Sequence, residues 1–267
     1  MTILSPTLTD IITLSRQAGE ILRADFGQNL RVDHKGVIDP VSEADRQSEA
    51  FLLSAIHQRF PADRIVAEES GEHSGTGDHV WYIDPLDGTV NYVHGVPIYS
   101  VSIAYAEADE LRMGVVYDPM RDECFSAEYG AGAWLNSQPI HPSFTSDLDS
   151  ALLVTGFAYD IRTNPENNLN HYAHFALRSQ GVRRLGSAAL DLCYVACGRI
   201  DGFWELRLKS WDVAAGALIA REAGAVVTNM AGEPDFMTAP QSVLTANPVL
   251  HPLMLGELLR KSDSPSP

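Results

Sequence analysis

Apolar residues recur at helical spacing in the first 60 residues and predict two packing helices. Between residues 8 and 26 the apolar positions follow a period near 3.6, and Thr7 and Asp10 form a capping pair at the start. The same periodicity returns between Ser42 and Pro61, where a serine precedes the apolar stripe and a proline follows it. We therefore expect two amphipathic helices that each bury one face.

Shorter runs of β-branched and aromatic residues predict strands. Two such runs, 64–67 and 80–83, both end in acidic residues. Residues 71–79 are polar and glycine-rich without periodicity, and predict a mobile loop. Three further runs are separated by turn residues and are expected to form an antiparallel meander: 98–106, 111–117 and 122–128.

The second half of the chain alternates strand-like and helical segments, which is an α/β pattern. The expected strands are 151–157, 182–185, 200–204, 225–228 and 243–246. The expected helices are 168–179, 188–197, 212–223 and 248–260. We predict an α+β half over residues 1–145, an α/β half over residues 146–260 and a disordered tail over residues 261–267, with the active site where the halves meet.

The net charge of the chain indicates which classes of binding partner are unfavourable. The 267 residues carry a formal net charge of −16, which disfavours direct binding to nucleic acid or to an anionic membrane, since both need a basic face. Three cysteines are too few for a disulfide framework, residues 1–10 have no basic residue and no apolar core typical of a signal peptide, and no apolar stretch reaches membrane-spanning length. We expect a cytoplasmic protein without a membrane anchor.

The most informative stretch follows the strand at 80–83, in the sequence DPLDGT. The buried run ends at Asp84, and Asp87 comes three residues later, so two carboxylates emerge at one strand edge with the Leu86 carbonyl between them. The N–H groups of Gly88 and Thr89 are free to face an anion. A tight turn is the competing interpretation, because Asp, Pro and Gly all favour turns.

Other acidic residues also stand at the ends of predicted elements. Glu68 follows the strand at 64–67, while Asp45 and Asp212 lie at helix starts, where each can serve as a simple cap. Taken singly, these positions favour capping over chemistry. Their common placement at element ends allows them to converge on one site.

With these motifs in view, the chain resembles the inositol monophosphatase family of lithium-sensitive, magnesium-dependent sugar phosphatases. Four motifs carry the resemblance in the family's order: residues 39–45 (DPVSEAD), 67–70 (AEES), 81–92 (WYIDPLDGTVNY) and 211–216 (WDVAAG). The resemblance extends over nearly the whole chain. It implies an α/β fold, a layered α-β-α-β-α sandwich of the sugar-phosphatase type, and a homodimer.

The resemblance also implies two to three Mg²⁺ ions per active site. Glu68, Asp84 and the carbonyl of Leu86 would hold one ion, and Asp84, Asp87 and Asp212 a second. A third, weaker ion would lie near Glu68. Paired cations of this kind would neutralise a phosphate dianion and supply a nucleophile near neutral pH.

Catalytic and substrate-binding roles follow from the same resemblance. Thr89, hydrogen-bonded towards Asp45, would orient a metal-activated water for in-line attack on phosphorus, with Glu68 as a further catalytic residue. The implied substrate and phosphate contacts are Asp87, Gly88, Thr89, Ala188 and Glu205. Glu205 alone also fits a surface acid after a strand.

The function implied is Mg²⁺-dependent hydrolysis of myo-inositol 1-phosphate, and of related inositol or sugar monophosphates, to alcohol and phosphate. Related alternatives are fructose 1,6-bisphosphatase or a dual-specificity sugar phosphatase, and then phosphatases of histidinol phosphate or 3′-phosphoadenosine 5′-phosphate. A haloacid-dehalogenase mechanism needs an Asp-x-Asp pair, whereas Asp84 and Asp87 are three residues apart. The non-enzymatic alternative is a regulatory, protein-binding member, whose expected mark is a lost metal ligand.

Overall fold

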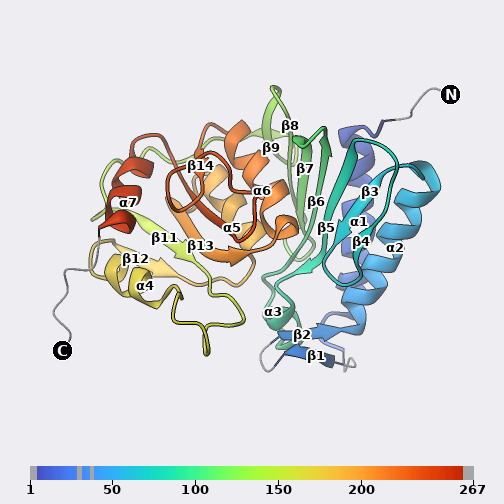
Figure 1. Cartoon of the computed structure of the whole chain (residues 1–267), viewed down its shortest axis with the longest axis horizontal. Helices are drawn as coiled ribbons and strands as arrows, with labels where there is room; N and C mark the ends of the chain where they lie inside the picture. The colour runs from blue at the N-terminus through green and yellow to red at the C-terminus, as the bar shows by residue number, and fades with distance from the viewer. Residues whose placement is uncertain (1–4, 29–31, 37–38, 261–267) are drawn as a thin grey trace.

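The computed structural model describes residues 5–28, 32–36 and 39–260, so the expected tail at 261–267 lies outside the described residues. The elements stack in five layers (Figure 1). Two N-terminal helices cover a large sheet, a middle helical layer separates it from a smaller sheet, and two further helices cover the far side. The α-β-α-β-α sandwich expected from the resemblance is confirmed.

The first layer consists of α1 (Leu8–Asp25) and α2 (Glu43–Arg59). Both helices begin with a capping box, in which a hydroxyl side chain and an acid three residues later satisfy each other's backbone N–H groups. The buried residues of each helix lie on one face. They pack against the side chains that the large sheet points towards these helices. The predicted amphipathic helices are therefore confirmed.

The large sheet has eight strands in the order β10-β9-β8-β7-β6-β5-β3-β4. Their bounds are β3 (Arg64–Ala67), β4 (Gly71–His73), β5 (His79–Asp87), β6 (Ser100–Glu107), β7 (Glu110–Asp118), β8 (Glu123–Glu128), β9 (Gly132–Leu135) and β10 (Gln138–Pro139). The strands β6 to β8 form the predicted antiparallel meander.

Two local predictions about this sheet are wrong. The expected mobile loop at 71–79 begins with a strand, because β4 pairs antiparallel with β3 and extends the sheet edge. The strand expected to stop at Asp84 continues as β5 to Asp87, which pairs with Ser100 after a bulge. The bulge lets a proline sit inside a paired strand, since the ladder is already interrupted there.

Two small elements have no counterpart in the sequence prediction. A hairpin of β1 (Val32–Gly36) and β2 (Asp39–Ser42) precedes α2, and the short α3 (Thr89–Val93) follows β5 directly. Gly88 joins β5 to α3 with a φ of 103°, and a Cβ there would lie 3.0 Å from the carbonyl oxygen of Ile98. Only glycine fits this turn without strain.

The smaller sheet has the order β12-β11-β13-β15-β14. Its strands are β11 (Leu152–Thr155), β12 (Gly181–Arg183), β13 (Gly202–Leu208), β14 (Val226–Thr228) and β15 (Gln241–Ala246). The strands β12, β11 and β13 are parallel, while β15 runs antiparallel to both β13 and β14. The helices of this half are α4 (Leu169–Ala176), α5 (Ala188–Ala196), α6 (Ser210–Glu222) and α7 (Leu250–Leu259).

The middle layer, α5 and α6, is shared by both halves. Every residue of α5 and eight consecutive residues of α6 are buried, so these helices are apolar on all sides. Close packing relies on small residues: a Cβ on Gly114 of β7 would meet the backbone of Ala215 at 2.9 Å. The middle of α6 is thereby packed directly against β7 of the large sheet.

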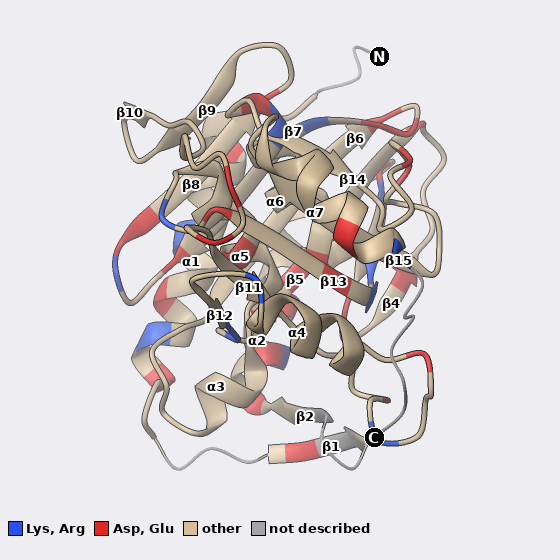
Figure 2. Ribbon diagram, turned by 90° about the vertical axis from the view of Figure 1, so that its left-hand side faces the viewer, with Lys and Arg blue, Asp and Glu red and all other residues tan. Residues whose placement is uncertain are grey.

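Charged residues lie mainly on the surface of the molecule, and several acids lie at strand ends. In the view of Figure 2 the basic segments are scattered over several elements and form no continuous stripe. This distribution agrees with the acidic balance of the chain. Across the described part of the chain, no helix combines the length and the apolar character needed to cross a bilayer.

Candidate active site

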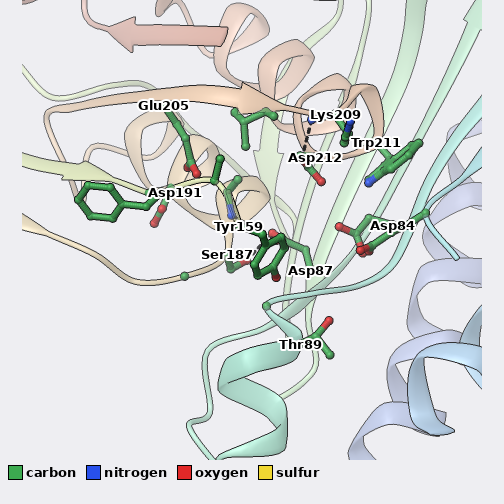
Figure 3. Close-up of a pocket in the computed structure, with 18 of the residues that line it drawn as sticks. Asp84, Asp87, Thr89, Tyr159, Ser187, Asp191, Glu205, Lys209, Trp211 and Asp212 are labelled. Atoms are coloured by element: carbon green, nitrogen blue, oxygen red, sulfur yellow. Dashed lines mark hydrogen bonds between the residues drawn. The ribbon is translucent and has the colours of Figure 1, made fainter. Parts of the chain in front are cut away.

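A pocket of about 290 Å³ opens between the end of β5, the N-termini of α5 and α6, and β13. Figure 3 shows its lining. Six acidic residues line the pocket: Glu68, Asp84, Asp87, Asp191, Glu205 and Asp212. The structure thus brings together acids that lie up to 144 residues apart in the sequence.

The bulge in β5 sets the positions of the two central aspartates. The backbone N–H of Leu86 donates to Asp84 Oδ1 at 3.0 Å, and the Ser48 hydroxyl of α2 donates to the carbonyl of Pro85 at 3.0 Å. These bonds hold the segment from both sides. Asp84 is 2% exposed, so its carboxylate is held in a desolvated position.

Asp87 links the end of β5 to the start of α5. Its carboxylate accepts hydrogen bonds from the Ser187 hydroxyl at 2.6 Å, the Ala189 N–H at 2.8 Å and the Ala188 N–H at 3.3 Å. It therefore caps α5 from another element, where the helix dipole favours a negative charge. Burial raises the pKa of Asp87 to about 6, although these hydrogen bonds act in the opposite direction. Because Ala188 donates to Asp87, this N–H is engaged within the chain and does not face the pocket unpaired.

Thr89 and Asp45 make the contact expected from the resemblance. The Thr89 hydroxyl lies 2.9 Å from Asp45 Oδ1 and 3.1 Å from the Leu86 carbonyl. Asp45 also accepts from the backbone N–H of Ser42 at 2.8 Å and from its hydroxyl at 2.5 Å. Burial raises the pKa of Asp45, which these hydrogen bonds partly offset. Asp45 is thus both the acidic member of the capping box of α2 and the hydrogen-bond partner of Thr89.

Asp212 likewise combines a cap with a place in the pocket. Its carboxylate accepts from the backbone N–H of Lys209 at 2.7 Å, drawn as the dashed line in Figure 3. The pKa values of Asp84 and Asp212 are both raised well above the ordinary value for an aspartate. Burial is the larger cause, and the negative charge of Glu68 is the second. This end of the pocket therefore holds more negative charge than its own residues neutralise. We call Glu68, Asp84, Asp87 and Asp212 the acid cluster.

The chemistry of the acid cluster fits hard divalent cations. Carboxylates and a backbone carbonyl are the oxygen donors that Mg²⁺ prefers, and a cation would relieve the repulsion that raises these pKa values. Within residues 5–28, 32–36 and 39–260, no three His, Cys, Asp or Glu side chains are gathered closely enough to hold an ion as they stand. Asp87 and Asp212 accept hydrogen bonds from backbone N–H groups at the starts of α5 and α6. The ligand assignments stay predictions.

The opposite end of the pocket has a different lining. Glu205 of β13 and Asp191 of α5 lie at this end (Figure 3), and the charge of Arg184, another lining residue, acts on both carboxyl groups. Burial raises the pKa of Glu205 to about 8, against the influence of Arg184. Asp191 was not among the expected site residues, although an acid in the otherwise apolar run ALDLCYVA was a usable signal.

Comparison with known proteins agrees with this architecture. The sequence model of the inositol monophosphatase family matches residues 4–263. The chain belongs to the inositol monophosphatase family. Its membership supports a phosphatase activity, while leaving the substrate open.

Three relatives within the family illustrate the range of named functions. The chain is 48% identical over 214 residues to an inositol-1-monophosphatase from Synechocystis, covering 79% of this chain and 74% of that protein. It is 39% identical over 256 residues to the Nus factor SuhB of Salmonella typhimurium, covering 95% and 96%. The solved structure of an inositol monophosphatase from Anabaena superimposes with a TM-score of 0.84 at 40% identity, covering 95% and 96%.

Proposed function

We propose that the protein is a Mg²⁺-dependent phosphomonoesterase that hydrolyses myo-inositol 1-phosphate and related inositol or sugar monophosphates. The observation that carries this proposal is the acid cluster at one end of the pocket, beside the hydrogen-bonded pair of Thr89 and Asp45. Two to three Mg²⁺ ions held by the acid cluster and the Leu86 carbonyl would supply charge neutralisation and activation of water.

The chain's own residues would orient the attack. The Thr89 hydroxyl donates its proton to Asp45 or to the Leu86 carbonyl, so its oxygen is available to accept a hydrogen bond from a water. A water held there is positioned for in-line attack, with Asp45 as the acceptor at the end of the proton path. Glu68, on the same side of the pocket, is the second candidate for this role.

Phosphate and alcohol would occupy different parts of the pocket. The turn at Gly88 and Thr89 faces the phosphate side, where backbone N–H groups can bind an anion. The alcohol would lie towards Asp87, Ala188 and Glu205. The chain is proposed to work in the cytoplasm as a homodimer, and sedimentation of the purified protein tests its oligomeric state.

A bisphosphate substrate is the second candidate. Arg184, Arg207 and Lys209 line the pocket from two separate segments, and their cationic groups would suit a second phosphate. Fructose 1,6-bisphosphate is therefore the main competing substrate, ahead of histidinol phosphate and 3′-phosphoadenosine 5′-phosphate. A regulatory, protein-binding role is a third candidate, favoured by relatives named Nus factor SuhB.

The test is phosphate release from these four esters with Mg²⁺, in the presence and absence of EDTA. We expect turnover of myo-inositol 1-phosphate to be the fastest and to stop with EDTA. Faster turnover of fructose 1,6-bisphosphate would reassign the substrate while keeping the acid cluster in its role. Absence of turnover with all four esters would contradict the enzymatic proposal and favour the regulatory one.

A further inference from the structure

Arg207, which lines the pocket, has a backbone conformation that residues other than glycine rarely adopt. Its φ is 62°, in the left-handed region. It is also the extra residue of a bulge in β13, where the pairing with β15 shifts between Leu206 and Leu208. For a residue with a Cβ this conformation is strained, and it persists only where surrounding contacts hold it. The contacts of the Arg207 side chain therefore need an account.

The Arg207 side chain forms an ion pair with Asp160, which lies between β11 and α4. The guanidinium Nη2 lies 2.8 Å from Asp160 Oδ2, and Asn164 Nδ2 donates to the same oxygen at 3.0 Å. The Asp160 carbonyl accepts from the backbone N–H groups of Thr163 and Asn164, both at 2.9 Å. The hydrogen bond from Asn164 and the charge of Arg207 lower the pKa of the Asp160 carboxyl, so it is ionised at neutral pH. Asp160 thus joins a compact turn to β13.

This turn belongs to a segment whose ends are pinned together. We call residues 157–167 the strap, which is part of the yellow-green trace between β11 and α4 in Figure 1. The buried Asn168 side chain donates to the Gly156 carbonyl at 2.7 Å and accepts from the Trp204 indole N–H at 2.7 Å. The strap therefore resembles an Ω-loop, fixed at its base by Asn168 and joined to β13 near its middle by the ion pair.

The first residues of the strap are part of the pocket lining. Phe157, Ala158 and Tyr159 all face the cavity, and Tyr159 is 47% exposed (Figure 3). A side chain this exposed is not held in place by burial in a core, so its position depends on where the strap lies. Arg207 lines the same cavity and meets the strap one residue after Tyr159. The ion pair therefore acts next to the lining that the strap supplies.

Resting on the proposed function, we propose that Arg207 is a positioning residue: its ion pair with Asp160 is a latch that holds the strap against the pocket, and this completes the lining around the bound phosphate ester. The two side chains are 40% and 37% exposed, so the latch has the modest strength of a surface pair. A pair of this strength biases the strap towards the closed position without locking it.

Limited proteolysis tests the latch without any use of activity. Arg162 is an exposed residue of the strap, and the bond to Thr163 is a site for trypsin. For Arg207→Gly and for Asp160→Asn we expect cleavage after Arg162 to be about two- to fivefold faster, the population change equivalent to one half-exposed ion pair. The double variant should be cleaved no faster than either single variant, because both changes remove the same contact.

Glycine at position 207 separates the latch from a general stabilising role. Glycine adopts the left-handed conformation without strain, so Arg207→Gly should leave Tm unchanged or raise it while cleavage of the strap becomes faster. An arginine with a merely structural role would lower Tm when removed. Ala108→Gly, at a φ of 47° in the turn between β6 and β7, is the matched control. It relieves the same kind of strain and should leave cleavage after Arg162 unchanged.

Steady-state kinetics test what the closed strap does for the ester. KM for myo-inositol 1-phosphate should rise about two- to fivefold in Arg207→Gly and in Asp160→Asn, with a smaller change in kcat, because only the closed form presents the complete lining. Inorganic phosphate, which under the proposed function occupies the turn at Gly88 and Thr89, should inhibit with an unchanged constant. Arg207→Lys keeps the charge and should recover part of the affinity.

Three results would overturn the proposal. An unchanged rate of cleavage after Arg162 in both variants would show that the ion pair does not hold the strap. Faster cleavage with an unchanged KM would show that the ester does not depend on the strap. A KM that rises for fructose 1,6-bisphosphate alone, with cleavage unchanged, would make Arg207 a contact for a second phosphate. If the unchanged protein hydrolysed no ester, the proposed function would fall, whereas the cleavage rates would still decide whether the latch exists.

Discussion

At the scale of single residues, most of the acids in this pocket serve two purposes. Asp45 and Asp212 each accept the N-cap backbone N–H at the start of a helix, and Asp212 also lines the pocket while Asp45 contacts its lining residue Thr89. Asp84 has no such second role, and its pKa is raised by burial and by neighbouring carboxylates. Its folded-state pKa lies above the ordinary value of 3.8, so its ionised form opposes folding. This cost is absent below pH 3.8 and grows as the pH rises towards the folded-state pKa.

Replacing Asp84 by Asn is therefore expected to stabilise the metal-free protein while abolishing turnover. The amide keeps the acceptor for the Leu86 N–H and removes the charge, so Tm in EDTA at pH 7 should rise by a few degrees. Thermal unfolding with and without Mg²⁺ measures this, and the Mg²⁺-dependent rise in Tm should shrink. Asp149→Asn, at an exposed position, is the control. A lower Tm for Asp84→Asn in EDTA would contradict the assigned repulsion.

At the scale of elements, α1 and α2 each begin with a capping box, but only the box of α2 lies beside the pocket. Thr7 and Asp10 close α1 at the surface, whereas Ser42 and Asp45 close α2 beside the pocket. Only the second box also holds the partner of the Thr89 hydroxyl. The start of α2 therefore couples helix stability to the geometry of the candidate catalytic pair.

The variants Ser42→Ala and Thr7→Ala separate these two effects. Each should lower the free energy of unfolding by about 1 kcal/mol, the usual cost of losing a cap. Ser42→Ala alone should also lower kcat, because Asp45 loses the hydroxyl that orients it. Urea unfolding and phosphate release measure the two quantities. Equal kcat values in both variants would show that Asp45 keeps its orientation without Ser42.

The sequence predicts the elements better than their boundaries. The alternation of apolar segments with turn residues identified the helices of the second half and the meander. It missed β4, whose residues Gly-Glu-His are polar and become a strand only by pairing with β3. It also ended β5 too early, because a bulge tolerates the proline that argues against a strand. Both errors arise from pairing between segments that local pattern does not encode.

The part of the candidate site that lies in recognisable sequence motifs could be predicted from the sequence. The residues expected as metal ligands all line one pocket, since they lie just after β3, in the last part of β5 or in the first turn of α6. Asp191 was missed because its spacing along α5 is that of an ordinary helix position, and its neighbour in the pocket, Glu205, comes from the separate strand β13. Such relations between distant segments appear only in three dimensions.

At the scale of the whole molecule, the two halves meet through one helical layer. Gly114 of β7 lies against the backbone of Ala215 in the middle of α6, whose first turn carries Asp212. Any atom added at Gly114 pushes this helix away from the large sheet. The displacement would separate Asp212 from the acids on β5.

Gly114→Ala should consequently weaken both folding and Mg²⁺ dependence. We expect a loss of about 1–3 kcal/mol in the free energy of unfolding, as for other overpacked cores, and a higher Mg²⁺ concentration for half-maximal activity. Denaturant unfolding and Mg²⁺ titration of phosphate release measure these changes. Gly77→Ala, whose Cβ would stay 3.8 Å from its nearest neighbour, should change neither. An unchanged Mg²⁺ requirement in Gly114→Ala would mean that α6 adjusts without moving Asp212.

The tie that Asp87 makes between β5 and the start of α5 bears on how this protein tolerates mutation. A carboxylate shared by both halves makes their alignment and their chemistry inseparable. In a library of random variants, inactivating changes should therefore extend well beyond the pocket, along the small residues of the middle helices. A fragment containing only one half would retain neither set of contacts, so activity should not be recoverable from either half alone.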